Sequence, residues 1–222
     1  MEAIEYKKLY EIQDIVIESI SKIETEFYLT GGTCLCRFYW EKRYSIDLDF
    51  FTNYSNSFHQ SIREIEDHFD KDGIVHQRIT ESKDFVRLMI DDYLQIDFIN
   101  DRVKYFGKNE IVNGLKIDNW ENILANKVTA VLARDNVKDI FDIFLVSKHK
   151  QFKWSDVIEK AKEKMTFEDS ELCERLMLFP KVMINKIDVC DFGFLENFEK
   201  EFNLIINDIC HKKENSLCQI VK

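Results

Sequence analysis

The sequence predicts an α/β protein in which a mixed sheet with helices is followed by a helical C-terminal half. Up to about residue 117, short strand-like apolar segments alternate with segments whose apolar residues recur at helical spacing. Beyond residue 119, only helical spacing remains. The 222 residues include 6 glycines and 1 proline, so we expect regular elements and few irregular loops. We therefore predict two domains, residues 1–117 and residues 118–222.

The N-terminal half contains an alternating series of predicted elements. Apolar residues at spacings of three and four indicate helices, and strict alternation indicates strands with one buried face. A hydroxyl at Thr33 could cap the helix that follows the Gly31-Gly32 turn. In chain order, we expect a helix over 5–24, a strand over 27–30, a helix over 33–40, a strand over 45–51, a helix over 57–70, and strands over 74–79, 85–90 and 94–99, the last two joined by a turn at Asp91-Asp92.

The C-terminal half is predicted to be entirely helical. Asn119 is suited to cap a helix that ends near Arg134, and a second helix is expected over 137–148. At least two more helices are expected within 154–207. Pro180 should break the helical pattern there, because proline lacks the backbone N–H and clashes with the preceding turn.

Composition and charge exclude several classes of protein. The N-terminus is acidic with no uninterrupted apolar stretch, and no window approaches the roughly eighteen apolar residues of a membrane span. We therefore expect a cytoplasmic protein with no membrane contact. None of the 6 cysteines forms a CxxC pair, which argues against a zinc site, and in a reducing cytoplasm we expect them to be buried or half-exposed thiols. The net charge of −10 argues against a broad nucleic-acid-binding surface, although a few local cations could still hold a nucleic-acid substrate.

Three aspartates indicate a metal centre. Asp47 and Asp49 are two residues apart on a predicted strand, so both side chains leave the same face. Two carboxylates that point together are tolerated best around a cation, and Mg²⁺ binds through one or two carboxylates together with phosphate oxygens. Asp97 lies in an otherwise apolar predicted strand, where a carboxylate needs a metal or cationic partner. It is the best candidate for a third ligand.

The Gly31-Gly32-Thr33 turn precedes the Asp-x-Asp strand and could supply the other half of such a centre. Glycine lets the backbone approach a ligand closely, and amides at the start of a helix attract phosphate. A Gly-Gly pair by itself is more often a plain turn, and an Asp-x-Asp pair by itself is usually a solvated strand face. Their order, with Asp97 in a later strand, favours a site for a Mg²⁺-bound nucleoside triphosphate.

These residues resemble the nucleotidyltransferase toxins of the AbiEii/AbiGii abortive-infection family. The family pattern is a Gly-Gly-Thr/Ser turn with Leu two residues on, then R-x-S-x-D-h-D-h, where h is apolar. It is matched at every position, with Arg43 and Ser45 as its Arg and Ser. The family belongs to the DNA polymerase β-like superfamily. The resemblance therefore implies a polymerase β-like nucleotidyltransferase palm with a mixed sheet, followed by a C-terminal helical bundle.

A second part of the resemblance lies in the helical half. Family members show a Lys, an Arg seven residues later, and then (R/K)-D-x-x-D, which Lys127, Arg134, Asp139 and Asp142 match. The resemblance implies that Lys127 contacts the phosphates of the nucleotide and that Asp139 or Asp142 shapes the site. The alternative is that these residues only form ion pairs between two helices.

The resemblance implies transfer of a nucleoside monophosphate from a triphosphate to an acceptor. Asp47 and Asp49 would bind two Mg²⁺ or Mn²⁺ ions, and Asp97 would join the catalytic ion and act as base. The nucleotide-binding residues would be Gly31, Gly32, Thr33, Arg43, Ser45, Lys127, Asp139 and Asp142.

The biological setting implied by the resemblance is a toxin–antitoxin or abortive-infection system, with RNA, and tRNA in particular, as the acceptor and a cognate antitoxin as partner. Two alternatives stay open. One is a small-molecule nucleotidyltransferase of the aminoglycoside-modifying kind, whose cationic substrate an acidic surface would suit. The other is a nucleotide-binding module without turnover, against which the three intact aspartates argue.

Overall fold

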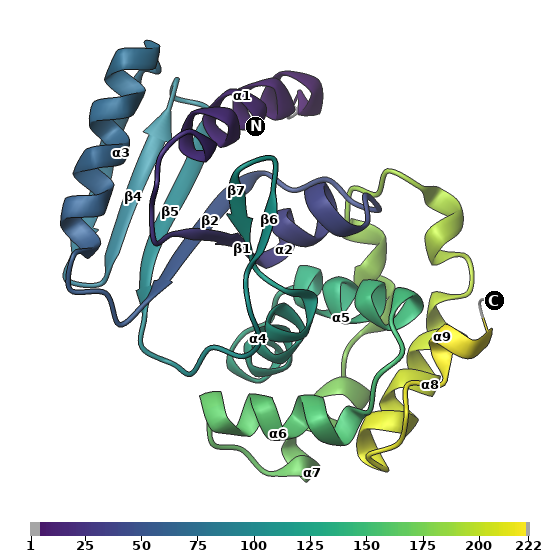
Figure 1. Ribbon diagram of the computed structural model, residues 1–222. Helices are drawn as coiled ribbons and strands as arrows, with labels where there is room; N and C mark the ends of the chain where they lie inside the picture. The colour runs from purple at the N-terminus through teal and green to yellow at the C-terminus, as the bar shows by residue number, and fades with distance from the viewer. Residues whose placement is uncertain (1–4, 221–222) are drawn as a thin grey trace. The chain divides into compact units, whose positions relative to one another are not determined.

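The computed structural model describes residues 5–220, and the chain divides into two compact units (Figure 1). The sheet unit takes the chain up to Cys34, Ser45–Val103 and Lys108–Asn119. The helical unit takes Leu35–Tyr44, Lys104–Gly107 and the chain from Trp120 onward. The chain thus passes more than once between the units, and each is described by itself below.

The sheet unit is built on a seven-stranded mixed sheet of order β3-β4-β5-β2-β1-β7-β6. β2 pairs with β5 in parallel, and so does β1 with β7, while the other neighbours are antiparallel. The strands are β1 (Tyr28–Thr30), β2 (Asp47–Asn53), β3 (His76–Ser82), β4 (Phe85–Ile90), β5 (Leu94–Asp101), β6 (Glu110–Val112) and β7 (Leu115–Ile117).

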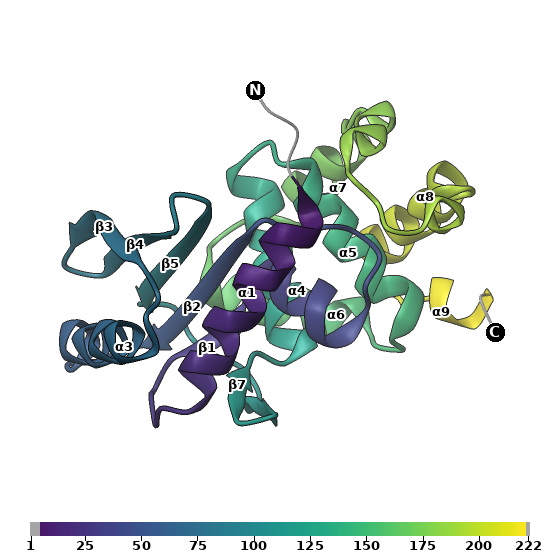
Figure 2. The same ribbon diagram turned by 90° about the horizontal axis from the view of Figure 1, so that it is seen from above.

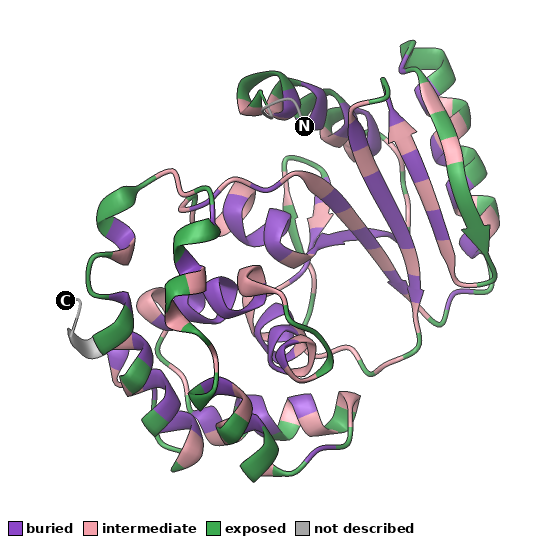
Figure 3. Cartoon of the chain, turned by 180° about the vertical axis from the view of Figure 1, so that it is seen from behind, coloured by how far each residue is buried: buried purple, intermediate pink, exposed green. Residues whose placement is uncertain are grey.

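Two long helices supply apolar residues to the core of the sheet unit. α1 (Tyr6–Ser21) packs against α3 (Phe58–Asp72), β5 and β7 (Figure 2). Along β2 and β4, buried residues alternate with partly exposed ones, as Figure 3 shows for the strands. This period of two places the apolar residues of a strand on one face and the intervening polar residues on the other. Phe50 and Phe98 stack in the core, and Asp47 and Asp49 lie on the opposite face of β2.

The helical unit is centred on α5 (Val137–His149), which is buried along most of its length. The side chain of Asn136 caps this helix by accepting a hydrogen bond from the Lys138 amide. α5 packs against α4, α8 and α9, and α4 packs in turn against α6 and α7. The remaining elements are η1 (Leu35–Tyr39), α4 (Trp120–Ala133), α6 (Trp154–Lys164), α7 (Asp169–Met177), η2 (Lys181–Lys186), η3 (Phe192–Leu195), α8 (Phe198–Cys210) and α9 (Leu217–Ile220). Of the helices within residues 5–220, none is long and apolar enough to cross a membrane.

The predicted α/β architecture is confirmed, as is the turn at Asp91-Asp92, where both residues adopt positive φ angles. The chain leaves helical structure after Met177, and Pro180 precedes the short helix η2. The hairpin β6–β7 was not predicted, although the Asn113-Gly114 pair at its turn is typical of tight hairpins. Each of its strands has only 3 residues, which is too short for a clear period of two.

The expectation of free thiols is wrong for two cysteines. Cys173 of α7 and Cys210 of α8 form a disulfide, with their Cα atoms 5.6 Å apart. The two cysteines are 37 positions apart in the sequence, so no local spacing pattern indicated the bond, and the packing of α7 against α8 brings them together. Cys34, Cys36 and Cys218 are buried thiols, and Cys190 is half-buried.

Replacing Phe98 tests the core of the sheet unit. The ring is fully buried, and its centroid lies 5.0 Å from that of Phe27. We expect Phe98→Ala to lower the free energy of unfolding by about 3–5 kcal/mol, because the substitution leaves a cavity. Phe192 is 87% exposed, so Phe192→Ala should change it by less than about 0.5 kcal/mol. Urea unfolding measures both, and a Phe98→Ala cost below about 1 kcal/mol would contradict the assigned core.

Candidate active site

The turn between β1 and β2 is fixed by a buried aspartate, Asp118. Its carboxylate accepts a hydrogen bond from the Thr30 hydroxyl at 2.6 Å, and its amide donates to the Leu29 carbonyl at 2.8 Å. Its carbonyl accepts from the Cys34 thiol at 3.7 Å. Asp118 therefore connects the end of β1 to the short helix α2 (Gly31–Cys34). Sequence reasoning missed this residue because the strand before it, β7, was not predicted.

Gly31 brings the backbone of the turn against Asp49. Its φ angle is +72°, a conformation that favours glycine. A Cβ atom at this position would lie 2.8 Å from Asp49 Oδ2, so a side chain would push the carboxylate away. Thr30 and Asp49 are direct partners in the pairing of β1 with β2. Conformation and close approach both explain why glycine begins this turn.

Thr33 and Ser45 connect the turn to the start of β2. The Thr33 hydroxyl lies 2.6 Å from the Ser45 hydroxyl and 2.5 Å from the carbonyl of Asp47. Both residues are buried. The expected helix cap at Thr33 is wrong, because the helix begins at Gly31 and the hydroxyl bonds to β2 instead. The contact places the backbone of the Asp-x-Asp strand relative to the Gly-Gly turn.

The three aspartates lie on one face of the sheet, on neighbouring strands. In the parallel pairing of β2 with β5, Asp47 lies opposite Gln95 and Asp49 lies opposite Asp97. Directly paired residues on adjacent strands point to the same face, about 5 Å apart. The sequence predicted this proximity from the strand pattern. It did not predict the residue on the other side of Asp97, which is Arg87.

Arg87 of β4 is the direct antiparallel partner of Asp97. Its Nε lies 2.7 Å from Asp97 Oδ1, and its Nη2 lies 2.8 Å from Oδ2. The hydrogen bonds with Asp97 raise the pKa of Arg87, and the charges of Asp97, Asp47 and Asp49 add to this effect although partial burial opposes it. The guanidinium thus lies in the electric field of all three carboxylates. A lone Arg in a strand gave no sequence signal for this role.

The donor chemistry of this face fits a divalent cation. Asp47 and Asp49 supply hard oxygen ligands from one strand face, and Asp97 adds a third from the next strand. Within residues 5–220, however, no three His, Cys, Asp or Glu side chains are gathered in the arrangement of metal ligands. The Asp97 carboxylate is directed at Arg87 instead. In this conformation, Asp47 and Asp49 are therefore the residues that would hold the cation.

The charged residues of the second motif form a network inside the helical unit. Lys127 Nζ lies 2.9 Å from Asp139 Oδ1 and 2.7 Å from Asp142 Oδ2. Arg43 Nε and Nη2 lie 2.9 and 3.0 Å from the two oxygens of Asp142. Arg134 Nε and Nη2 lie 2.7 and 3.0 Å from the two oxygens of Asp139. The predicted site residues therefore form two groups, one in each unit.

Both aspartates of this network are fully buried. Burial acts to raise the pKa of Asp142, but the charges of Arg43 and Lys127 and their hydrogen bonds outweigh it and hold the pKa below its usual value. The pKa of Asp139 is lowered in the same way by Lys127 and Arg134. These are the ion pairs that the alternative interpretation of the motif expects. Nucleotide binding by Arg43, Lys127, Asp139 or Asp142 stays a prediction.

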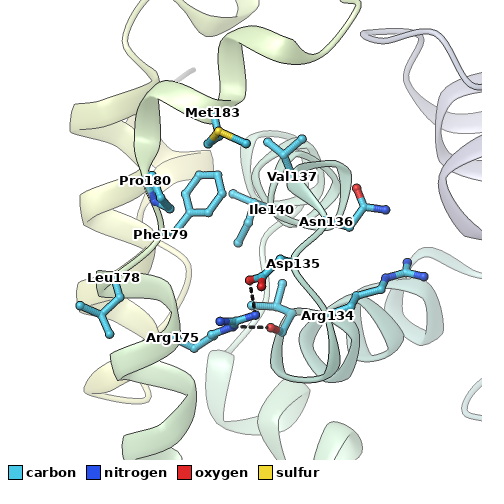
Figure 4. Close-up of a pocket in the computed structure, with 11 residues that line it drawn as sticks. Arg134, Asp135, Asn136, Val137, Ile140, Arg175, Leu178, Phe179, Pro180 and Met183 are labelled. Atoms are coloured by element: carbon cyan, nitrogen blue, oxygen red, sulfur yellow. Dashed lines mark hydrogen bonds and ion pairs between the residues drawn. The ribbon is translucent and has the colours of Figure 1, made fainter.

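A cavity of about 420 Å³ lies within the helical unit (Figure 4). Phe179, Pro180 and Met183 line one side, and Val137 and Ile140 of α5 line the other. Polar groups line part of its edge, where an arginine and an aspartate form an ion pair, Arg175 with Asp135. This mostly apolar lining does not suit a triphosphate.

Substituting two glycines with alanine separates backbone strain from the contact with Asp49. Gly31 and Gly73 have nearly the same φ angle, +72° and +71°, but a Cβ at Gly73 would meet nothing within 4 Å. Both substitutions should lower the free energy of unfolding by about 1–2 kcal/mol, because alanine is strained in the left-handed conformation. Gly31→Ala should lower it by roughly a further 1 kcal/mol or more, because the added methyl group is overpacked against Asp49. Urea unfolding measures the difference, and equal costs would mean that the close approach does not matter.

Asp142→Asn tests the buried network. It leaves Arg43 and Lys127 short of a buried counter-charge, so we expect a loss of about 3–5 kcal/mol at neutral pH. The folded-state pKa of Asp142 is depressed, so its contribution is complete above the unfolded value of about 3.9 and is lost as the pH falls through the folded value.

The difference between wild type and Asp142→Asn, measured by urea unfolding across pH, should therefore shrink below about pH 4. The matched control is Asp135→Asn, because the Asp135 side chain is 90% exposed in its pair with Arg175 and should contribute about 0–1 kcal/mol. A cost for Asp142→Asn no larger than that of the control would contradict the assigned network.

Comparison with known proteins identifies the family of the chain and structures of similar fold. Residues 15–205 match the family model described as nucleotidyl transferase AbiEii toxin, type IV TA system. JHP933 from Helicobacter pylori has a similar structure, with a TM-score of 0.58 and 15% identity over 100% of this chain and 95% of that chain. A candidate nucleotidyltransferase from H. pylori gives a TM-score of 0.59 and 18% identity over 100% of this chain and 99% of that chain.

The two structural similarities concern the fold, which is the predicted nucleotidyltransferase fold. A comparison with curated proteins gives no match. The family model covers most of the chain, including the Gly-Gly turn, the three aspartates and the second motif. The chain belongs to the AbiEii family of nucleotidyltransferase toxins of toxin–antitoxin systems.

Proposed function

We propose that the protein transfers a nucleoside monophosphate from a nucleoside triphosphate to RNA, with a divalent cation as cofactor. The observation that carries the proposal is the row of carboxylates across β2 and β5. Asp49 lies opposite Asp97, Asp47 shares its face, and the backbone of Gly31 lies against Asp49. Carboxylates that lie beside a backbone turn are suited to bind a triphosphate through a metal ion.

The three aspartates divide into two roles in this proposal. Asp47 and Asp49 would hold Mg²⁺ or Mn²⁺, and Asp97 would join the catalytic cation and accept the proton of the acceptor hydroxyl. The acceptor oxygen forms a bond to the α-phosphorus, the bond from that phosphorus to the bridging oxygen breaks, and pyrophosphate leaves. When bound, the cations lower the pKa of the attacking hydroxyl and offset the charge of the leaving pyrophosphate. The backbone of Gly31, Gly32 and Thr33 positions the triphosphate.

The remaining motif residues take part less directly. Ser45 and Thr33 are buried and bonded to each other, so we propose that they shape the turn. In the network of the helical unit, Lys127 pairs with both Asp139 and Asp142. The role of Lys127 in balancing phosphate charge is proposed from the motif, which lies within the part of the chain that matches the family model.

The family supports a cognate antitoxin as partner, and the RNA acceptor is our own proposal. AbiEii proteins are toxins of type IV toxin–antitoxin systems, so we propose a cognate antitoxin and a cellular RNA as the acceptor, with tRNA as the first to test. The net charge of −10 favours one other acceptor, a cationic small molecule such as an aminoglycoside. The presence of all three aspartates argues against a module that binds nucleotide without turnover.

A labelling experiment tests the proposal. The protein is incubated with each α-labelled nucleoside triphosphate, Mg²⁺ or Mn²⁺, and total RNA, purified tRNA or an aminoglycoside. We expect label in RNA, with release of pyrophosphate, and none with Asp47→Asn or Asp49→Asn, because these variants lose the cation ligands. Phe192→Ala, at an exposed position of the helical unit, is the control that keeps activity. Labelling of the aminoglycoside alone would replace the RNA assignment, and labelling that survives both aspartate substitutions would refute the catalytic one.

A further inference from the structure

We propose that Arg87 is a positioning residue. Its guanidinium holds the Asp97 carboxylate away from the metal site at Asp47 and Asp49 until a divalent cation takes the place of the guanidinium. This inference rests on the proposed function, because it concerns the third carboxylate of that site. The guanidinium is bonded to both carboxylate oxygens of Asp97, and Gln95 Nε2 lies 3.2 Å from Oδ2 as well. Both oxygens of the carboxylate are thus bonded to protein donors in this conformation.

The register of the sheet gives Asp97 two alternative neighbours. On β4 its direct partner is Arg87, and on β2 its direct partner is Asp49. Like charges that lie directly opposite on adjacent strands destabilise a sheet, so Asp97 needs a cation on one side or the other. Arg87 supplies it here. A divalent cation bound at Asp49 would supply it from the opposite side.

Exposure and packing indicate which partner moves. The Asp97 side chain is 11% exposed, whereas that of Arg87 is 35% exposed and can leave towards solvent. Phe85, two residues earlier on β4, has its ring centroid 5.4 Å from the guanidinium carbon. The guanidinium therefore has an aromatic partner on its own strand in addition to Asp97. The rigid bidentate geometry of arginine also fixes the direction of Asp97 more tightly than a lysine would.

The other interpretation is that Arg87 is a permanent counter-ion whose only role is stability. Another arginine of the sheet unit, Arg78, pairs with Glu66 and Glu81, away from the three aspartates, and serves as the comparison. The two interpretations differ in one respect. A counter-ion that a cation must displace competes with metal binding, and a purely structural pair does not.

Binding of Mn²⁺ without nucleotide, followed by electron paramagnetic resonance, separates them in the full chain. We expect Arg87→Met to lower the dissociation constant for Mn²⁺ about tenfold, which is an effect of the size seen when two residues in direct contact are coupled. Arg87→Lys should lower it by a smaller factor. Arg78→Met is the matched control and should leave the constant unchanged. Arg87→Lys decides the question if Arg87→Met does not fold, because it keeps the charge and loses the two-point contact.

The effect must act through Asp97. In an Asp97→Asn background, Arg87→Met should change the dissociation constant by less than about twofold. The inference is overturned if Arg87→Met and Arg87→Lys leave Mn²⁺ binding unchanged, or if the gain persists in full without the Asp97 charge.

A failure of the proposed function would look different. In that case Mn²⁺ binding by the wild type would not depend on Asp47 or Asp49. Mn²⁺ binding that depends on those two residues but ignores Arg87 would leave the function in place and remove only the role of Arg87.

Discussion

The parallel pairing of β2 with β5 is the constraint on which the sheet unit depends. On one face the pairing buries Leu48 and Phe50 beside Ile96 and Phe98, which contributes the hydrophobic stabilisation that holds the strands together. On the other face the same register brings carboxylates together, which electrostatics alone would oppose. The core thus holds in place an arrangement that is unfavourable until a cation joins it. Arg87 offsets part of that cost in the conformation described here.

The turn after β1 is subject to a related constraint. Gly31 can approach Asp49 only because it has no Cβ, and the buried Asp118 keeps the turn in that position.

In the helical unit, the buried ion pairs of Lys127, Asp139 and Asp142 join α4 to α5, and Arg43 attaches the Leu35–Tyr44 segment to them. Buried ion pairs contribute little net stability, but removing one member is costly, so they favour a single arrangement of these segments.

The sequence was sufficient to predict most of the elements and the position of the three aspartates on one face of the sheet. The reason is that periods of 2 and 3.6 are strong in long amphipathic segments. It was insufficient for the β6–β7 hairpin and the Cys173–Cys210 disulfide, since short strands carry little pattern and packing alone brings the cysteines together. The role of Arg87 follows from the strand register, and that of Asp118 follows from a strand that was not predicted. Neither could be found from local spacing.

The metal site can be located by Mn²⁺ anomalous scattering from crystals grown with a non-hydrolysable nucleoside triphosphate. We expect metal peaks about 2.1 Å from oxygens of Asp47 and Asp49. We also expect the Arg87 guanidinium to have left Asp97, so that the Asp97 carboxylate faces the metal. A metal bound elsewhere, or bound at Asp47 and Asp49 while Arg87 still holds both oxygens of Asp97, would contradict the proposed site.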